Sequence, residues 1–149
     1  MGPQLAQARA ATAQYHDVAV ALADGFVRAS PCISSPAGTM GFHYVNHSRM
    51  DDTAAIDEPE VLLYLPNDGE LALVAVEYVV PVFQDGQPYF GTAPPAEPGP
   101  HPELFGRPFD GPMPGHAPGE PWHYDLHVWV WSHNPAGMFR PFNPSLSCS

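Results

Sequence analysis

Residues 61–80 read VLLYLPNDGELALVAVEYVV, and this stretch does more than any other to define the fold. Two apolar runs, 61–65 and 71–80, are rich in β-branched and aromatic residues, which favour β-strands. Between them, residues 66–70 contain an Asp-Gly pair, the strongest local signal for a tight turn between antiparallel strands. The stretch therefore predicts a β-hairpin.

Helical and strand patterns flank this hairpin. Within residues 1–25, apolar side chains recur at spacings of three and four, which places them on one face of a helix that Gly25 ends. The expected buried face of the helix consists of Leu5, Ala8, Ala11, Tyr15, Val18, Ala19 and Leu22. Strand character also appears at 39–46 and 122–131, so the sheet is expected to occupy residues 39–80 and 122–131.

The order of these elements predicts an α+β fold, because one helix is followed by about four strands in meander order. We expect the N-terminal helix to pack on a curved antiparallel sheet, in a cystatin-like or half-barrel arrangement. A small β-barrel with an added helix is the alternative. A length of 149 residues fits one domain, so residues 1–149 are expected to share one core.

Residues 81–121 hold twelve of the twenty prolines, a composition that often marks a disordered linker. Large apolar residues are interleaved with these prolines, and linkers seldom carry so many: Tyr89, Phe90, Leu104, Phe105, Phe109 and Met113. We therefore expect an ordered, irregular loop that covers the sheet, a type of long loop that is often functional.

The charge balance excludes several classes of partner. Sixteen acidic residues face five arginines, with no lysine, which gives a net charge of −11. Phosphate backbones and anionic lipid would repel such a chain, so nucleic acid is not an expected partner. No apolar run reaches the roughly 18 residues of a membrane span. Residues 1–11 also lack the basic and apolar regions of a signal peptide.

The two cysteines, Cys32 and Cys148, are expected to form a disulfide bond. No histidine or second cysteine lies near Cys148 at zinc-finger spacing, so the simplest use of Cys148 is to hold the C-terminal tail. Disulfides persist in oxidising compartments, which predicts a secreted or otherwise extracytoplasmic protein. The alternative is two unpaired thiols in a cytosolic protein.

Glu77 lies in a strand that is apolar on both faces. By alternation its side chain should point to the same side as Leu73, Ala75 and Val79. An isolated buried carboxylate costs several kcal/mol, so it must be protonated, paired with a cation or bound to a metal. A structural ion pair with Arg107 or Arg140 is the alternative to metal binding.

The last predicted strand carries His123, Asp125 and His127 on one face, together with Trp129 and Trp131. The two imidazoles would lie about 13 Å apart on a regular strand, at about 3.3 Å per residue. Both could bind the same ion only through a bulge or a long reach inward on a curved strand. Otherwise one is expected to bind the ion, and the other to lie in the second shell or to act in acid–base chemistry. Asp125 between them is expected to orient an imidazole from the second shell, as carboxylates commonly do behind metal-bound histidine.

Two further histidines complete the expected site. His43 interrupts an apolar and aromatic strand, where the alternative is a satisfied core histidine. His116 lies in the covering loop and is either a ligand or an exposed loop residue. Three strands that each place a His or Glu in an apolar setting fit one shared interior site. The predicted metal ligands are therefore His43, Glu77, His116, His123 and His127.

Histidine with carboxylate is the ligand set of zinc, copper and non-haem iron, and an exported protein would meet zinc or copper. Common catalytic motifs are missing from the sequence: it has no His-Glu-x-x-His, no Gly-x-Ser-x-Gly and no Gly-x-Gly-x-x-Gly. The sequence thus predicts a polar metal site without indicating a reaction.

Three segments of the chain resemble a group of uncharacterised exported bacterial proteins. These segments are 41–46 (GFHYVN), 104–116 and 123–129 (HYDLHVW). The similarity covers most of the chain, including the helix and Cys148. It implies export and a single domain, and it carries no catalytic roles with it.

Three functions are compatible with these residues. The first is an exported metal-binding protein, either a metalloenzyme or a carrier. The second is a metal-free pocket for a small molecule, in which Glu77 and His127 or His123 are the catalytic base and acid, and Tyr44, Phe105 and Trp129 line the pocket. The third is a non-catalytic extracellular interaction module that uses the proline-rich loop.

Overall fold

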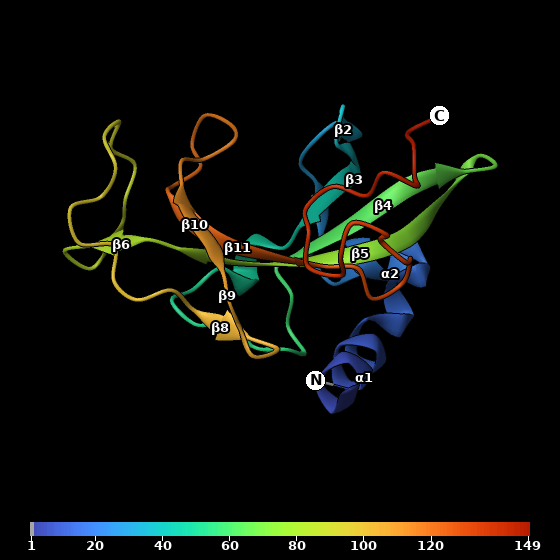
Figure 1. The fold of residues 1–149 in the computed structure, drawn as a ribbon, viewed down its shortest axis with the longest axis horizontal. Helices are drawn as coiled ribbons and strands as arrows, with labels where there is room; N and C mark the ends of the chain where they lie inside the picture. Colours follow the sequence, from blue (N-terminus) through green and yellow to red (C-terminus); the bar gives the residue numbers. More distant parts are fainter. Residues whose placement is uncertain (1) are drawn as a thin grey trace.

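The N-terminal segment forms two helices where the sequence predicts one. The computed structural model describes residues 2–149, with α1 at Gly2–Thr12, a 3-10 turn at Ala13–His16 and α2 at Val18–Ala23 (Figure 1). The Asp17 carboxylate accepts a hydrogen bond from the Ala19 amide and caps α2, so the chain starts a new helix there.

This break changes which side chains are buried. Leu22 was expected on the buried face and is instead half exposed, while Ala21 is fully buried. The single-helix prediction was wrong because a continuous 3.6-residue period cannot pass through the 3-10 turn. Gly25 follows α2 with a φ of 104°, so the predicted helix stop at Gly25 is confirmed.

The sheet is antiparallel throughout and its strand order is β1–β3–β4–β5–β11–β10, with β2 pairing β3. Four longer strands occupy the predicted regions: β3 (Gly38–Val45), β4 (Val61–Asn67), β5 (Glu70–Pro81) and β11 (His123–Val128). The shorter strands are β1 (Val27–Arg28), β2 (Ile33–Ser35) and β10 (Asp110–Met113). The α+β prediction is confirmed. Across the described residues the sheet does not close into a barrel, so the barrel alternative is wrong.

The β4–β5 hairpin turns at Asp68 and Gly69, as the Asp-Gly pair predicts. The pairing register of the hairpin shifts by one residue between Leu63 and Tyr64: Leu63 pairs with Ala75, whereas Tyr64 pairs with Leu73. This bulge leaves Val74 as an extra residue in β5. Leu73 therefore faces the opposite side of the sheet from Ala75, and the prediction that it shares a face with Glu77 was wrong.

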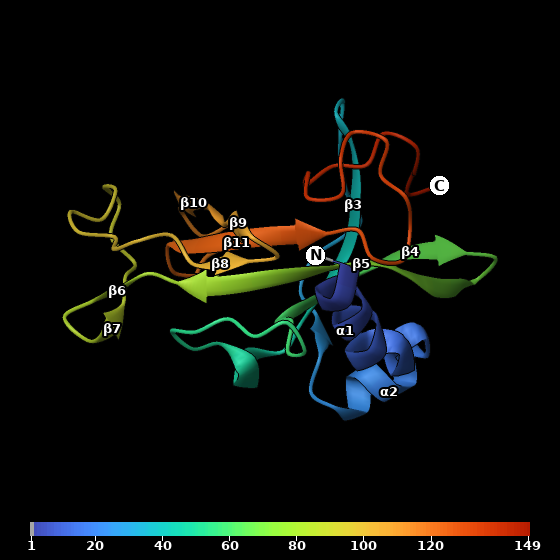
Figure 2. The same ribbon diagram turned by 60° about the horizontal axis from the view of Figure 1, so that its bottom comes forward.

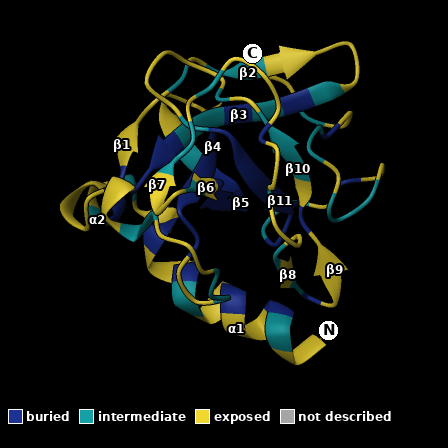
Figure 3. Ribbon diagram, turned by 90° about the vertical axis from the view of Figure 1, so that its left-hand side faces the viewer, coloured by how far each residue is buried: buried dark blue, intermediate teal, exposed yellow. Residues whose placement is uncertain are grey.

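The sheet buries a different cluster on each face. In Figure 2, α1 and α2 lie on one side of β4 and β5, and the C-terminal segment lies on the other. The helix-side cluster is the larger and contains Tyr15, Phe26, Tyr64, Tyr78 and Leu126. The opposite cluster contains Val61, Leu63, Ala75, Val79 and Trp129. Figure 3 shows the central strands β4 and β5 as buried, the edge strand β1 as exposed and the opposite edge strand, β10, as mostly of intermediate burial.

The proline-rich segment 81–121 contains short strands as well as irregular backbone. Two small hairpins form here: β6 (Phe83–Gln84) with β7 (Gln87–Pro88), and β8 (Glu103–Leu104) with β9 (Arg107–Pro108). The segment then supplies β10, which pairs with β11 and forms the edge of the sheet. A short 3-10 helix, η2 (His47–Arg49), lies in the connection before β4.

The last strand is shorter than predicted. The regular pairing with β5 ends at Val128, because the Trp129 amide donates to the Met138 carbonyl, although the Trp131 and Ser132 amides still donate to Val74 of β5. Trp129 stays in the cluster opposite the helices. Trp131 packs on the helix side, where its ring contacts His16, so the prediction that Trp131 shares a face with His127 was wrong.

The predicted disulfide is confirmed and joins Cys32 to Cys148, 116 residues apart. It ties the C-terminal tail to the loop before β2, over the sheet face opposite the helices. Among the described residues, no helix is long and apolar enough to cross a membrane.

Candidate metal centre

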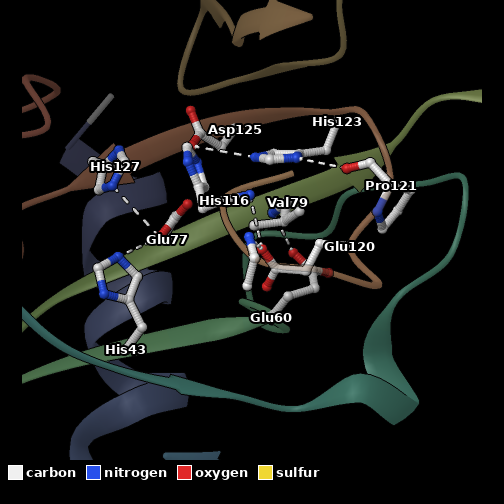
Figure 4. Close-up of polar contacts among 11 residues, drawn as sticks. His43, Glu60, Glu77, Val79, His116, Glu120, Pro121, His123, Asp125 and His127 are labelled. Carbon is white, nitrogen blue, oxygen red and sulfur yellow. Dashed lines mark hydrogen bonds and ion pairs between the residues drawn. The ribbon is translucent and has the colours of Figure 1, made fainter. Parts of the chain in front are cut away.

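Three strands bring polar side chains together on the face opposite the helices. Glu77 of β5 is paired directly with His127 of β11. His43 of β3 is paired with Leu63 of β4, so its side chain reaches across β4 toward β5. Figure 4 shows the imidazoles of His43 and His127 both directed at the Glu77 carboxylate. The structure thus gathers three of the five predicted ligands into one group.

The distances in this group are too long for hydrogen bonds. The Glu77 Oε1 atom lies 3.5 Å from His43 Nε2 and 3.4 Å from His127 Nε2. Hydrogen bonds from N–H to oxygen usually measure about 2.7–3.2 Å. Within the described residues, Glu77 Oε1 and both ring nitrogens of His127 are buried and have no hydrogen-bond partner. Buried polar atoms without a partner are rare and require an explanation.

The same distances suit a metal ion placed between the three side chains. Zinc binds nitrogen and oxygen at about 2.0–2.2 Å in a tetrahedron, which separates neighbouring ligand atoms by about 3.3–3.6 Å. The ligand atoms of His43, Glu77 and His127 all lie within 4.8 Å of one another. A cation in the middle would satisfy Glu77 Oε1 and His127 Nε2, two of the three buried atoms without a partner.

Ser30 fixes the tautomer of His43. The Ser30 hydroxyl donates its only hydrogen to the Pro31 carbonyl at 2.8 Å and accepts from the His43 amide at 3.0 Å. Its remaining lone pair accepts from His43 Nδ1 at 3.2 Å, so Nδ1 carries the hydrogen. The lone pair of Nε2 then faces Glu77, which is the orientation that a metal ligand needs.

Burial sets the charges in this group. It lowers the pKa of His43 to about 4, with a further lowering from nearby His127, and burial also lowers the pKa of His127. Burial raises the pKa of Glu77 well above its ordinary value, and the neighbouring Asp125 carboxylate adds to this. Both imidazoles are therefore neutral at pH 7, and each has a nitrogen lone pair available to bind a metal ion. Their contacts with Glu77 are then not ion pairs.

The alternative ion pair of Glu77 with an arginine does not form. Among the described residues, the basic side chains within 4.0 Å of the Glu77 carboxylate are two histidines and no arginine. Arg107 lies over the Phe139 ring, 4.8 Å from its centroid. The backbone carbonyl of Arg140 accepts a hydrogen bond from the Trp129 ring N–H. The prediction of a structural pair with Arg107 or Arg140 was wrong, because both residues are placed elsewhere.

A second group lies beside the first and consists of His116, His123 and Asp125. Its ligand atoms also lie within 4.8 Å of one another. The His123 Nδ1 atom donates to the Pro121 carbonyl at 3.1 Å, which leaves the Nε2 lone pair 4.0 Å from Asp125 Oδ2. The structure thus places His123 and His127 in different groups, and it places Asp125 where it can act as a ligand.

His116 reaches the second group from the loop between β10 and β11. The Glu120 carboxylate accepts hydrogen bonds from the amides of His116 and Ala117, both at 2.9 Å, and so holds the loop. The His116 ring lies edge-on to the His123 ring, with centroids 5.2 Å apart. His116 is itself exposed, whereas His123 is buried.

Both groups border a cavity of about 870 Å³. Small-molecule sites typically measure about 300–1,000 Å³. Its walls include the apolar side chains of Ile33, Met40, Met50, Phe83, Phe90 and Phe142, and no arginine is among the described residues that line it. Tyr44 and Phe105, which were expected to line a pocket, pack in the helix-side cluster instead, so that prediction was wrong.

Sequence reasoning missed one buried carboxyl group. Glu60 directly precedes β4 and is 2% exposed, and its Oε1 atom accepts a hydrogen bond from the Val79 amide at 2.8 Å. Burial raises the pKa of Glu60 to about 8. In the sequence, Glu60 ends an acidic connection, where a glutamate is usually exposed to solvent. Its burial results from the packing of β4 against β5, which the sequence pattern does not indicate.

Comparisons with models of protein families, with curated proteins and with solved structures find no match to this chain. The resemblance to exported bacterial proteins therefore stays a prediction. The chemistry of the site is inferred from the chain's own residues.

Proposed function

We propose that this protein binds a divalent metal ion, zinc or copper, through His43, Glu77 and His127. The observation that supports this most strongly is the Glu77 carboxylate, which lies 3.4–3.5 Å from two imidazole nitrogens without a hydrogen bond to either. Two of the three ligand atoms, Glu77 Oε1 and His127 Nε2, are buried and have no hydrogen-bond partner among the described residues. A cation between them would remove the cost of burying them unpaired.

The donor atoms limit the choice of metal. The group offers two imidazole nitrogens and one carboxylate oxygen, a set that suits zinc and copper and is too rich in nitrogen for magnesium or calcium. Both cysteines are in the disulfide, so neither offers a thiolate. The neutral state of the two histidines leaves their lone pairs available near pH 7.

The cavity supports a role beyond structure for the bound ion. Three protein ligands leave a fourth position open, as in catalytic rather than structural zinc sites. The group borders the cavity, so a small molecule entering it would reach that position. We infer a metalloenzyme or a metal carrier, working outside the cytoplasm. The Cys32–Cys148 disulfide supports the extracytoplasmic location.

The test is zinc and copper binding by the purified full chain, prepared without chelator and then titrated. Wild-type protein should bind near-stoichiometric metal by elemental analysis. The change Glu77→Gln should lower the affinity at least about 100-fold, since the loss of outer-shell partners alone costs about 10–100-fold. The matched control is Glu70→Gln, at the exposed start of the same strand.

Two results would contradict the proposal. The first is wild-type protein that takes up no zinc or copper after exposure to either. The second is Glu77→Gln protein with unchanged affinity. Circular dichroism of each variant separates loss of the ligand from loss of the fold.

The cavity also favours a second candidate, a metal-free pocket in which Glu77 is the general base and His127 the general acid. Burial raises the pKa of Glu77, which makes its carboxylate a stronger base than an exposed one. This candidate predicts no metal uptake. It also predicts that an apolar fluorescent probe binds wild-type protein in the presence of chelator and is affected by changes at Glu77.

A further inference from the structure

The group of His116, His123 and Asp125 is not used by the proposed function. Asp125 and His127 are alternate residues of β11, so their side chains leave the same face of the strand about 6.6 Å apart. His127 belongs to the first group and Asp125 to the second. The two groups are therefore neighbours along one strand, and Figure 4 shows them side by side.

Glu77 and Asp125 are neighbours at the boundary between the groups. Both are buried, 5% and 4% exposed, and they lie diagonally across the β5–β11 pair, in which Glu77 pairs with His127 and Val79 with Asp125. Two buried carboxylates placed in this way repel each other, and a cation between them would offset the repulsion. The chain has no lysine, and no arginine lines the cavity among the described residues. The charge that this pair lacks is not supplied by a side chain.

The histidines of the second group can act as metal ligands. The hydrogen bond of His123 Nδ1 to the Pro121 carbonyl leaves the Nε2 lone pair aimed at Asp125. The ring of His116 contacts the His123 ring, from a loop held by Glu120. Two imidazoles and a carboxylate repeat the donor set of the first group.

We infer that the protein holds a second zinc or copper ion at His116, His123 and Asp125, next to the first, with the Glu77–Asp125 pair between the two ions. This inference rests on the proposed function, because Glu77 then serves both positions. Proteins with two neighbouring metal ions commonly place carboxylates between them. The pair of ions would occupy the polar side of the apolar cavity.

The two positions should differ in affinity. Each position has two ligands that are less than a tenth exposed, but the first takes all three ligands from strands, and its third ligand, His43, is half-buried. The second takes one ligand, His116, from an exposed loop. The loop must stay ordered for this ligand to bind, which costs conformational entropy. We therefore expect the first position to fill before the second.

The experiment is a zinc titration of chelator-treated full-length protein by calorimetry and elemental analysis, with copper for electron paramagnetic resonance. Wild-type protein should bind two ions in two steps. His116→Ala should keep one ion and lose the second, with at least about a 100-fold fall in its affinity, more than the loss of an outer-shell partner. Because His116 is exposed, this change leaves the core intact. His133→Ala, in another exposed position, is the control.

Copper provides an independent readout. Two adjacent Cu²⁺ ions couple magnetically, so wild-type protein with two equivalents should give fewer spins than copper atoms. His116→Ala with one equivalent should give one isolated spin. Asp125→Asn should remove the second ion as well, and circular dichroism checks its fold.

The possible outcomes separate the two proposals. One ion per chain, unchanged by His116→Ala, overturns the second position and leaves the first intact. Two ions retained in His116→Ala also overturn the assignment, since the second ion would lie elsewhere. No ion in wild-type protein overturns the proposed function and this inference together.

Discussion

Two carboxyl groups buried by the same sheet have different surroundings. The Glu60 Oε1 atom accepts a hydrogen bond from the Val79 amide, which offsets part of the free-energy cost of removing this carboxyl group from water. Glu77 Oε1 faces two imidazoles and has no hydrogen-bond partner within the described part of the chain. At the scale of the residue, this difference separates a carboxyl group with a structural hydrogen bond from the one that the proposed function assigns to a metal ion.

The change Glu60→Gln should alter how stability depends on pH. Burial raises the folded-state pKa of Glu60 to about 8, from 4.5 for the free group. Between these values the folded chain holds a proton that the unfolded chain releases. Its stability therefore falls as pH rises through this range, by up to about 1.4 kcal/mol per pH unit. Glutamine keeps the acceptor for the Val79 amide and does not ionise.

The free energy of unfolding in urea, with chelator present, should thus fall less steeply from about pH 5 to about pH 8 in Glu60→Gln than in wild-type protein. Glu58→Gln, two residues away and exposed, should follow the wild-type curve. Parallel curves for wild type and Glu60→Gln would show that Glu60 ionises normally in the folded protein.

At the scale of the element, the geometry of β3, β4 and β5 decides which side chains share a face. The bulge at Val74 resets the alternation of β5 so that Ala75, Glu77 and Val79 face away from the helices. In β3, Gly41 lies two residues before His43, at a point where the backbone of β4 comes very close. Both features place site residues through backbone geometry rather than through side-chain contacts.

Gly41→Ala should therefore destabilise the protein strongly. Gly41 has a φ of 106°, and an added Cβ would lie 2.5 Å from the Tyr64 carbonyl oxygen. Gly69, in the hairpin turn, has a φ of 82° with nothing within 4 Å of an added Cβ. Both changes strain the backbone, so the extra loss in Gly41→Ala reports the clash. We expect about 1–3 kcal/mol more in denaturant unfolding than for Gly69→Ala. Equal losses would mean that β3 can move away from β4 without cost.

At the scale of the whole molecule, the disulfide joins two segments that line the cavity. Cys32 lies between Pro31 and Ile33, which both line the cavity, and Cys148 lies in the tail that follows Pro141 and Phe142, two further lining residues. The bond closes a loop of more than a hundred residues. It therefore lowers the conformational entropy of the unfolded chain, which stabilises the folded state, and it holds the tail over the candidate site.

Removing this bond with the double change Cys32→Ser and Cys148→Ser should lower the free energy of unfolding by about 2–5 kcal/mol. Wild-type protein kept in reductant should behave in the same way, which separates loss of the bond from the effect of serine. Denaturant unfolding measures both. A double variant as stable as the oxidised wild type would show that the tail is held by packing alone.

Much of the fold could be predicted because its signals are local. The Asp-Gly turn and the apolar runs beside it define the hairpin, and Gly25 ends the helical segment. The alternation of β11 correctly separates Tyr124 and Leu126 from the histidines. The bulge at Val74 was not predicted, because nothing in an apolar run indicates where the partner strand will shift its register.

By itself, the sequence determined the strands, the α+β class, the disulfide and the presence of polar side chains in apolar surroundings, since each follows from residue type and short-range periodicity. Only the tertiary structure decided which of these side chains meet. His127 faces Glu77, and His43 reaches the same carboxylate across β4, because of the registers of three strand pairs. Ser30 orients the His43 imidazole from a position 13 residues earlier in the chain, and Pro121 orients the His123 imidazole from the loop just before β11. Registers depend on how the whole sheet packs, so no local pattern encodes them.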